Sequence, residues 1–153
     1  MLDRIWQEGY EPNGLEDVTA DTFWPWIAKS WRRSTDYLLQ HPEQIALWRG
    51  FQEGWRTLSD SGPARRLRQR SLSMGMALAR RGQELGVIRD DMTPMQCAEL
   101  VEALDVVTDG WFFVVADTEG AAVAMDRLAP RTLDLIWRLL APAHEVQAAL
   151  RDV

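Results

Sequence analysis

The stretch from Ala79 to Thr93, ARRGQELGVIRDDMT, predicts that one helix ends and another begins at a defined place. Gly86 follows the helical pattern, and glycine readily adopts the left-handed backbone conformation with which many helices end. Thr93 is placed to cap the next helix, Pro94 suits its first position, and Gln96 completes a capping box. Two boundaries specified so closely predict a chain built from separate, long helices.

The rest of the chain is divided in the same way by proline, glycine and capping residues, and no alternating pattern of useful length indicates a strand. We therefore expect an all-α helical bundle. The first expected helix runs from a cap at Thr22 to about Gln40, and the second runs from Pro42 to a break over residues 59–63. The third runs from that break to Leu85, and the fourth from Pro94 to about Ala116. A short helix follows, and the last helix begins at Pro130. One face of the helix after Thr22 is predicted to turn inward through Trp24, Ile27, Trp31, Ser34 and Leu38.

Length and charge limit the function classes. At 153 residues we expect a single domain, with a core from about residue 20 to 141, the end of a helix and a loop over 1–19, and a tail over 142–153. The net charge of −6, from 23 acidic and 17 basic residues, opposes binding of this chain alone to nucleic acid. No apolar run approaches the roughly 20 residues of a membrane span, and no secretion signal is recognisable, so we expect a cytoplasmic protein without a membrane partner.

Few residues point to catalysis or to a metal. The single Cys97 lies within a helical pattern and is expected to be structural, and His41 and His144 do not pair with it by any recognisable spacing. Neither a metal nor a cofactor is therefore expected. Phosphate loops and nucleophile elbows are absent from the sequence. An enzyme on this scaffold would need an acid or base in an apolar site, for which Asp105 is the first candidate and Asp109 the second.

The helix from Pro94 is apolar on more than one side, although a helix that packs only on its own chain needs a single apolar stripe. One face carries Val101, Asp105, Thr108 and Phe112. The other carries Leu100, Leu104, Val107, Trp111 and Val114. With the apolar residues of the last helix, this second face is the predicted homodimer interface, made by Leu100, Leu104, Val107, Trp111, Leu133, Ile136, Trp137 and Leu140.

Eight tryptophans in one domain either build the core or line a binding site. In the second interpretation, flat and rigid rings form a site for a small hydrophobic or aromatic ligand, with an adaptable methionine beside them. The predicted ligand-binding residues are Trp31, Trp48, Phe51, Trp55, Met74, Asp105, Thr108 and Phe112.

Asp105 is the most informative polar residue of this set. A carboxylate on the face of Val101 and Phe112 must find a partner, or its pKa must rise. The partner would be a polar or cationic ligand, or else Thr108 or an arginine of a neighbouring helix.

Three passages resemble the C-terminal domain of TetR-family transcriptional regulators. They are YLLQHPEQIALWRGF, with a helix that ends at His-Pro, LARRGQELGVIRDDMTPMQCAEL, with its Gly-Val/Ile-Arg-Asp junction, and LVEALDVVTDGWFFV. The resemblance covers about residues 20 to 141. It implies a helical domain that dimerises through its last two long helices as a four-helix bundle and that holds an effector pocket between the earlier helices.

The family's DNA reader, a three-helix unit with a helix-turn-helix, has no counterpart in this sequence. The resemblance therefore implies an effector-binding and dimerisation domain without operator binding of its own. The sequence is either a fragment of a longer regulator or a natural protein that uses the scaffold without a reader. The alternatives are a stand-alone protein that binds or transforms a hydrophobic or aromatic molecule, and a dimerisation module without a ligand.

Overall fold

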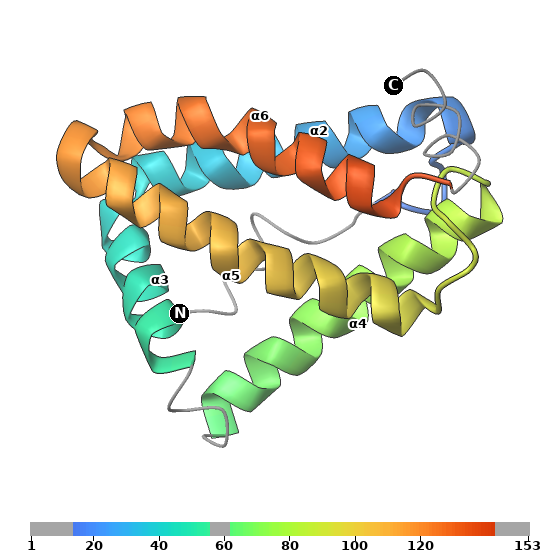
Figure 1. Ribbon diagram of the computed structural model, residues 1–153, viewed down its shortest axis with the longest axis horizontal. Coiled ribbons are helices and arrows are strands. Elements are labelled where there is room, and N and C mark those ends of the chain that lie inside the picture. Colours follow the sequence, from blue (N-terminus) through green and yellow to red (C-terminus); the bar gives the residue numbers. More distant parts are fainter. Residues whose placement is uncertain (1–13, 56–61, 143–153) are drawn as a thin grey trace, which may run out of the picture.

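The computed structural model describes residues 14–55 and 62–142, which form five helices and, within these ranges, no strand. In chain order the helices are α2 (Ala20–Gln40), α3 (Pro42–Trp55), α4 (Gly62–Glu84), α5 (Pro94–Glu119) and α6 (Ala121–Leu140) (Figure 1). The all-α prediction is thus confirmed for the described part of the chain. The side chains of Phe51 and Trp55, two predicted ligand-binding residues, lie outside the described residues.

The junction between α4 and α5 has the predicted boundaries. Gly86 has a φ of 71°, which only glycine adopts without strain. The Thr93 hydroxyl accepts the backbone N–H of Gln96 at 3.2 Å, and the Gln96 side chain accepts the backbone N–H of Thr93 at 2.8 Å. Both halves of the predicted capping box are therefore present.

The predicted start of α2 is wrong by three residues. The cap is Thr19 rather than Thr22, and the Thr22 hydroxyl accepts the backbone N–H of Thr19 at 2.9 Å. Pro25 consequently lies inside the helix. Its ring removes a hydrogen bond to the carbonyl of Asp21, and because both residues are exposed, water can replace that bond.

The predicted separate helix from Pro130 is also wrong, because α6 is a single helix of 20 residues that contains this proline. Pro130 and Asp126, whose carbonyl loses its partner, are exposed. On the opposite side of α6, Leu128 and Ile136 are buried. Burial of each such side chain is worth about 1.5–3 kcal/mol, which offsets the roughly 3 kcal/mol cost of an interior proline.

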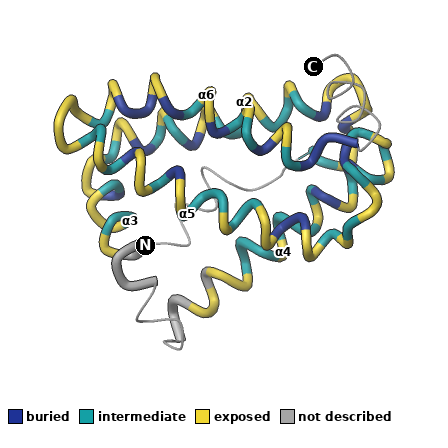
Figure 2. The backbone as a smooth tube through the Cα atoms, viewed as in Figure 1, coloured by how far each residue is buried: buried dark blue, intermediate teal, exposed yellow. Residues whose placement is uncertain are grey.

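Buried apolar side chains form two clusters. The junction cluster consists of Val18, Phe23, Ala79, Ile88, Cys97, Ile136 and Leu140. The far cluster consists of Leu38, Phe112, Ala124, Met125 and Leu128. The inward face predicted for α2 is confirmed, since Trp24, Ile27 and Trp31 pack against the junction cluster and Ser34 and Leu38 are buried. Figure 2 shows buried segments on α2, α5 and α6, whereas the described first half of α4 has none.

Helix α4 crosses α5 at an angle. At Gly75 the two backbones approach so closely that an added Cβ would lie 2.9 Å from the Cβ of Ala98. Seven residues earlier on α4, Arg68 meets Glu102, which is only four residues further along α5. The backbone of the first half of α4 therefore lies apart from that of α5, and the two backbones approach each other closely only where the helices cross (Figure 1).

Candidate functional site

Helices α2 and α5 run in the same direction and each contributes to both clusters (Figure 1). Phe23 and Cys97 belong to the junction cluster, while Leu38 and Phe112 belong to the far cluster. On α2, Trp31 lies eight residues after Phe23 and seven before Leu38. On α5, Asp105 lies eight residues after Cys97 and seven before Phe112. At 1.5 Å per residue, Trp31 lies about 12 Å from Phe23 and Asp105 about 12 Å from Cys97 along their helices, and Trp31 still packs against the edge of the junction cluster. We call this position between the clusters the middle level.

The carboxyl group of Asp105 is the first unusual feature of the middle level. Its Oδ1 atom is fully covered and forms no hydrogen bond with any described residue, although the residue as a whole keeps some exposed surface. The Thr108 hydroxyl donates to the backbone carbonyl of Asp105 at 3.2 Å, and not to its carboxyl group. The arginine of the neighbouring helix, Arg68, binds Glu102 instead. Neither of the partners predicted within the chain therefore takes the carboxyl group.

Burial raises the pKa of Asp105 from 3.8 to about 8, and the nearby charges of Asp109 and Glu102 add to the effect. Asp105 is therefore mostly protonated at neutral pH. In that state the carboxyl group can both donate and accept a hydrogen bond.

The indole N–H of Trp31 is the second unusual feature of the middle level. Like Oδ1 of Asp105, it is buried and has no hydrogen-bond partner among the described residues. Buried polar atoms without a partner cost about 1–3 kcal/mol each, so native proteins contain few of them. Two further such atoms belong to Gln44 and Arg81, and the guanidinium of Arg81 already donates to the carbonyl of Val18 at 2.7 Å. Among the described residues, the unpartnered donor of Trp31 and the unpartnered acceptor of Asp105 lie at corresponding positions along α2 and α5.

Trp48 of α3 packs against the far cluster and contacts α5. Its indole N–H donates to Oδ2 of Asp109 at 3.0 Å, and its ring is stacked on Phe112 with centroids 5.0 Å apart. Phe113 lies 4.9 Å from the same ring. The structure thus brings the predicted residues Trp48, Phe112 and Asp109 together, about one to two turns of α5 after Asp105. Asp109 accepts a hydrogen bond here, which distinguishes it from Asp105.

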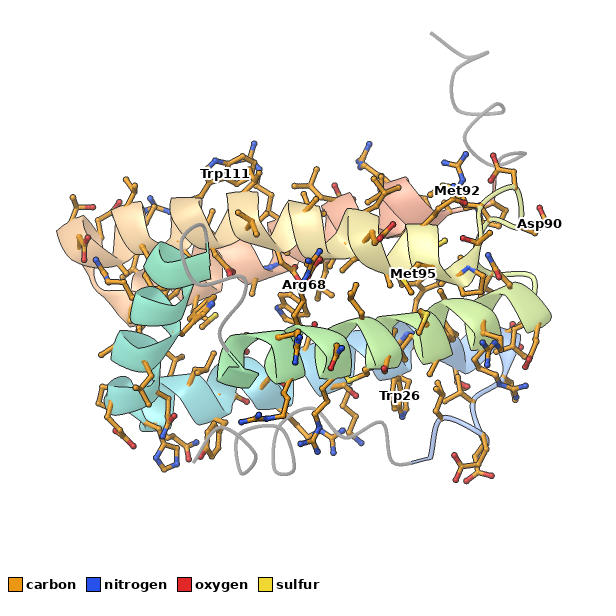
Figure 3. The ribbon with its side chains drawn as sticks, turned by 90° about the horizontal axis from the view of Figure 1, so that it is seen from below. Trp26, Arg68, Asp90, Met92, Met95 and Trp111 are labelled. Atoms are coloured by element: carbon orange, nitrogen blue, oxygen red, sulfur yellow. The ribbon has the colours of Figure 1, made fainter. Side chains whose placement is uncertain are left out.

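Glu102, three residues before Asp105 on α5, is paired with Arg68. Arg68 reaches from α4 to α5 (Figure 3), and its guanidinium donates through two nitrogens to the Glu102 carboxylate at 3.0–3.2 Å. This hydrogen bond, together with the charge of Glu102, raises the pKa of Arg68. Sequence reasoning missed this pair, although the three acids Glu102, Asp105 and Asp109 recur at the three- and four-residue spacing of one helix face.

The other predicted ligand-binding residues differ in their degree of burial. Thr108 and Phe112 are buried, and Met74 is partly buried on α4.

The predicted dimer residues fall into two groups. Leu100, Val107 and Trp111 of α5 and Trp137 of α6 are exposed, as are the neighbouring Val114, with 68% of its surface exposed, and Val123. Figure 3 shows Trp111 on the outer side of α5. Ile136 and Leu140, by contrast, belong to the junction cluster, Leu104 packs against that cluster, and Leu133 is partly buried. These inward residues share a helix with the exposed ones, which is why the sequence pattern grouped them.

Within the described ranges, no group of three histidine, cysteine, aspartate or glutamate residues is arranged to hold a metal ion. Of the helices described, none has the length and apolar character needed to cross a membrane. The candidate site comprises the covered Oδ1 atom of Asp105, the covered indole N–H of Trp31, and the acids Glu102 and Asp109, which have partners.

Comparison of the chain with protein-family models, with curated proteins and with solved structures found no match.

Proposed function

We propose that this chain is a small-molecule-binding and dimerisation domain of the kind found in TetR-like regulators, and that its ligand binds at the middle level. The observation that carries the proposal is the pair of covered polar atoms without partners, Oδ1 of Asp105 and Nε1 of Trp31. A ligand with a polar group and a flat apolar body would give these atoms a partner and would contact aromatic rings on either side. The exposed apolar residues of α5 and α6 support dimerisation through these helices.

A fluorescence titration with N-phenylnaphthylamine tests the binding function. This probe is flat, apolar and neutral, and it carries a single N–H that Oδ1 of Asp105 would accept. We expect saturable binding of one probe per chain. Asp105→Leu should weaken it by about tenfold, since a hydrogen bond of typical strength is lost. Asp126→Leu, at an exposed acid of α6, is the matched control and should bind as the unchanged protein does.

Two results would count against the proposed function. Absence of saturable binding would remove the support for a ligand site. Equal binding by the Asp105→Leu variant would place any site away from the middle level.

Catalysis is a second candidate function, favoured by the raised pKa of Asp105, because a carboxyl group that titrates near pH 8 is suited to general acid or base chemistry. Turnover of a bound small molecule that Asp105→Asn abolishes would support an enzyme. Saturable binding without product would support a sensor.

A further inference from the structure

The three acids on one face of α5 differ in their partners. Glu102 is held by Arg68 through two nitrogens, and Asp109 accepts the indole N–H of Trp48. Asp105 lies between them, and its covered Oδ1 has no partner among the described residues. Of these three acids, Asp105 is thus the one whose carboxyl oxygen could accept a hydrogen bond from a ligand.

The electrostatic surroundings of Asp105 favour a positively charged donor. In the described residues, the charges that act on Asp105 are those of Asp109 and Glu102, and Glu102 is itself paired with Arg68. The two flanking carboxylates attract a cation and repel an anion. The charges of Asp109 and Glu102, which add to the effect of burial on the Asp105 pKa, would also favour an ammonium group next to it.

Aromatic rings near the row add to this preference. Trp48 packs on both Phe112 and Phe113, and the guanidinium carbon of Arg49 lies 4.7 Å from the centre of the Phe113 ring. The aromatic group already accommodates one cation of the chain itself. Ring faces and carboxylates together are the features with which proteins bind organic cations.

We infer that the ligand of the middle level is an organic amine with a flat apolar body, whose ammonium group donates to the carboxylate of Asp105. This inference rests on the proposed function and specifies its ligand class. On binding, the Asp105 carboxyl group releases its proton to solvent, and the ammonium group takes the place of that proton. Because Asp105 titrates near pH 8, this release lowers the affinity only about tenfold at pH 7.

Isothermal titration of the full chain at pH 7 with naphthylethylamine, naphthylethanol and naphthylacetate tests the inference, because these probes differ mainly in the charge of their end group. We expect the amine to bind on the order of tenfold more tightly than the alcohol, and the acetate most weakly. Asp105→Asn should remove the advantage of the amine, and Asp126→Asn, which removes an exposed acid, should preserve it.

A second measurement needs no variant. In the unchanged protein, the affinity for the amine should rise between about pH 6 and pH 8, as Asp105 loses its proton, while the affinity for the alcohol stays constant. Equal affinities for amine and alcohol, or an advantage of the amine that Asp105→Asn preserves, would overturn the inference and leave the proposed function intact. Failure of all three probes to bind at millimolar concentration would overturn both.

Discussion

Asp105 places a carboxyl group on a helix face whose neighbours Thr108 and Phe112 are buried. The sequence pattern predicted that such a group either finds a partner or has a raised pKa. In the structure the pKa rises to about 8, because burial dominates and the flanking acids Asp109 and Glu102 reinforce it. The cost of this arrangement to folding can be measured.

The first prediction concerns the pH dependence of stability. The folded chain holds a proton on Asp105 between its unfolded pKa near 3.8 and its folded pKa of about 8. The contribution of this proton to stability is fully present below about pH 4 and is lost as the pH rises through 8. We therefore expect the free energy of unfolding, relative to Asp105→Asn, to fall by several kcal/mol between about pH 4 and pH 8.

Urea denaturation of both proteins across this range measures the difference. Comparison with Asp105→Asn cancels the titration of all other groups that the two proteins share. A difference that stays constant with pH would mean that Asp105 is ionised in the folded chain.

At the scale of elements, the junction between α4 and α5 is fixed by Gln83 as well as by Gly86 and Thr93. The Gln83 side-chain amide donates to the carbonyl of Arg89 at 2.9 Å and to the carbonyl of Met92 at 2.8 Å. The backbone N–H of Arg89 in turn donates to the carbonyl of Leu140, at the end of α6, at 2.8 Å. The Gln83 side chain thus holds the loop between α4 and α5, and the backbone of this loop contacts the end of α6.

The second prediction follows from these contacts. Gln83→Leu removes the donor of two partly buried carbonyl groups and should lower the free energy of unfolding by about 1–3 kcal/mol. Gln69→Leu, an exposed position on the same helix, is the control and should change stability by less than about 0.5 kcal/mol. Chemical denaturation of both variants distinguishes them, and equal effects would show that the Gln83 contacts do not stabilise the junction.

The boundaries of the elements were predictable where local chemistry decides them. The caps at Gly86, Thr93 and Gln96 depend on neighbours within three residues, which the sequence shows directly. Pro130 was misjudged because the burial of Leu128 and Ile136, which keeps α6 continuous, depends on helices far away in the sequence. Thr19 was missed for a different reason, since Thr19 and Thr22 are both good caps and only their mutual hydrogen bond selects the first.

For the whole molecule, the buried apolar residues form two clusters, and α2 and α5 each contribute to both and carry an unpartnered polar atom between their contributions. The residue types of this site were predictable from sequence, because Trp31, Trp48 and Asp105 fall on inward faces at helical spacing. The hydrogen-bond partners of these residues could not be predicted from the sequence. Which indole bonds to Asp109, and which carboxylate holds Arg68, depends on the angle at which α3 and α4 cross α5, and this angle is not encoded in any local pattern.

The third prediction concerns assembly. Trp111 and Val107 are both exposed and lie about one turn apart on α5, within the surface that we propose to form the dimer. Trp111→Glu and Val107→Glu should convert a dimer into a monomer, because a buried charge without a partner is strongly disfavoured in an apolar interface. Leu47→Glu, at a similarly exposed apolar residue of α3, should leave the dimer intact.

Size-exclusion chromatography with light scattering reports the mass of each variant. A monomeric unchanged protein would contradict the proposed interface. So would a Trp111→Glu variant that remains dimeric.

We propose that the Asp105 carboxyl group serves a ligand and not the fold. Leucine has nearly the shape of aspartate, and it carries no polar atom that needs a partner. The most direct measurement is the free energy of unfolding of Asp105→Leu at pH 7 without ligand. We predict that the variant is more stable than the unchanged protein by about 1–3 kcal/mol, because a covered polar atom without a partner is removed. A variant less stable by a similar amount would contradict the account, since it would show that the carboxyl group holds the fold together.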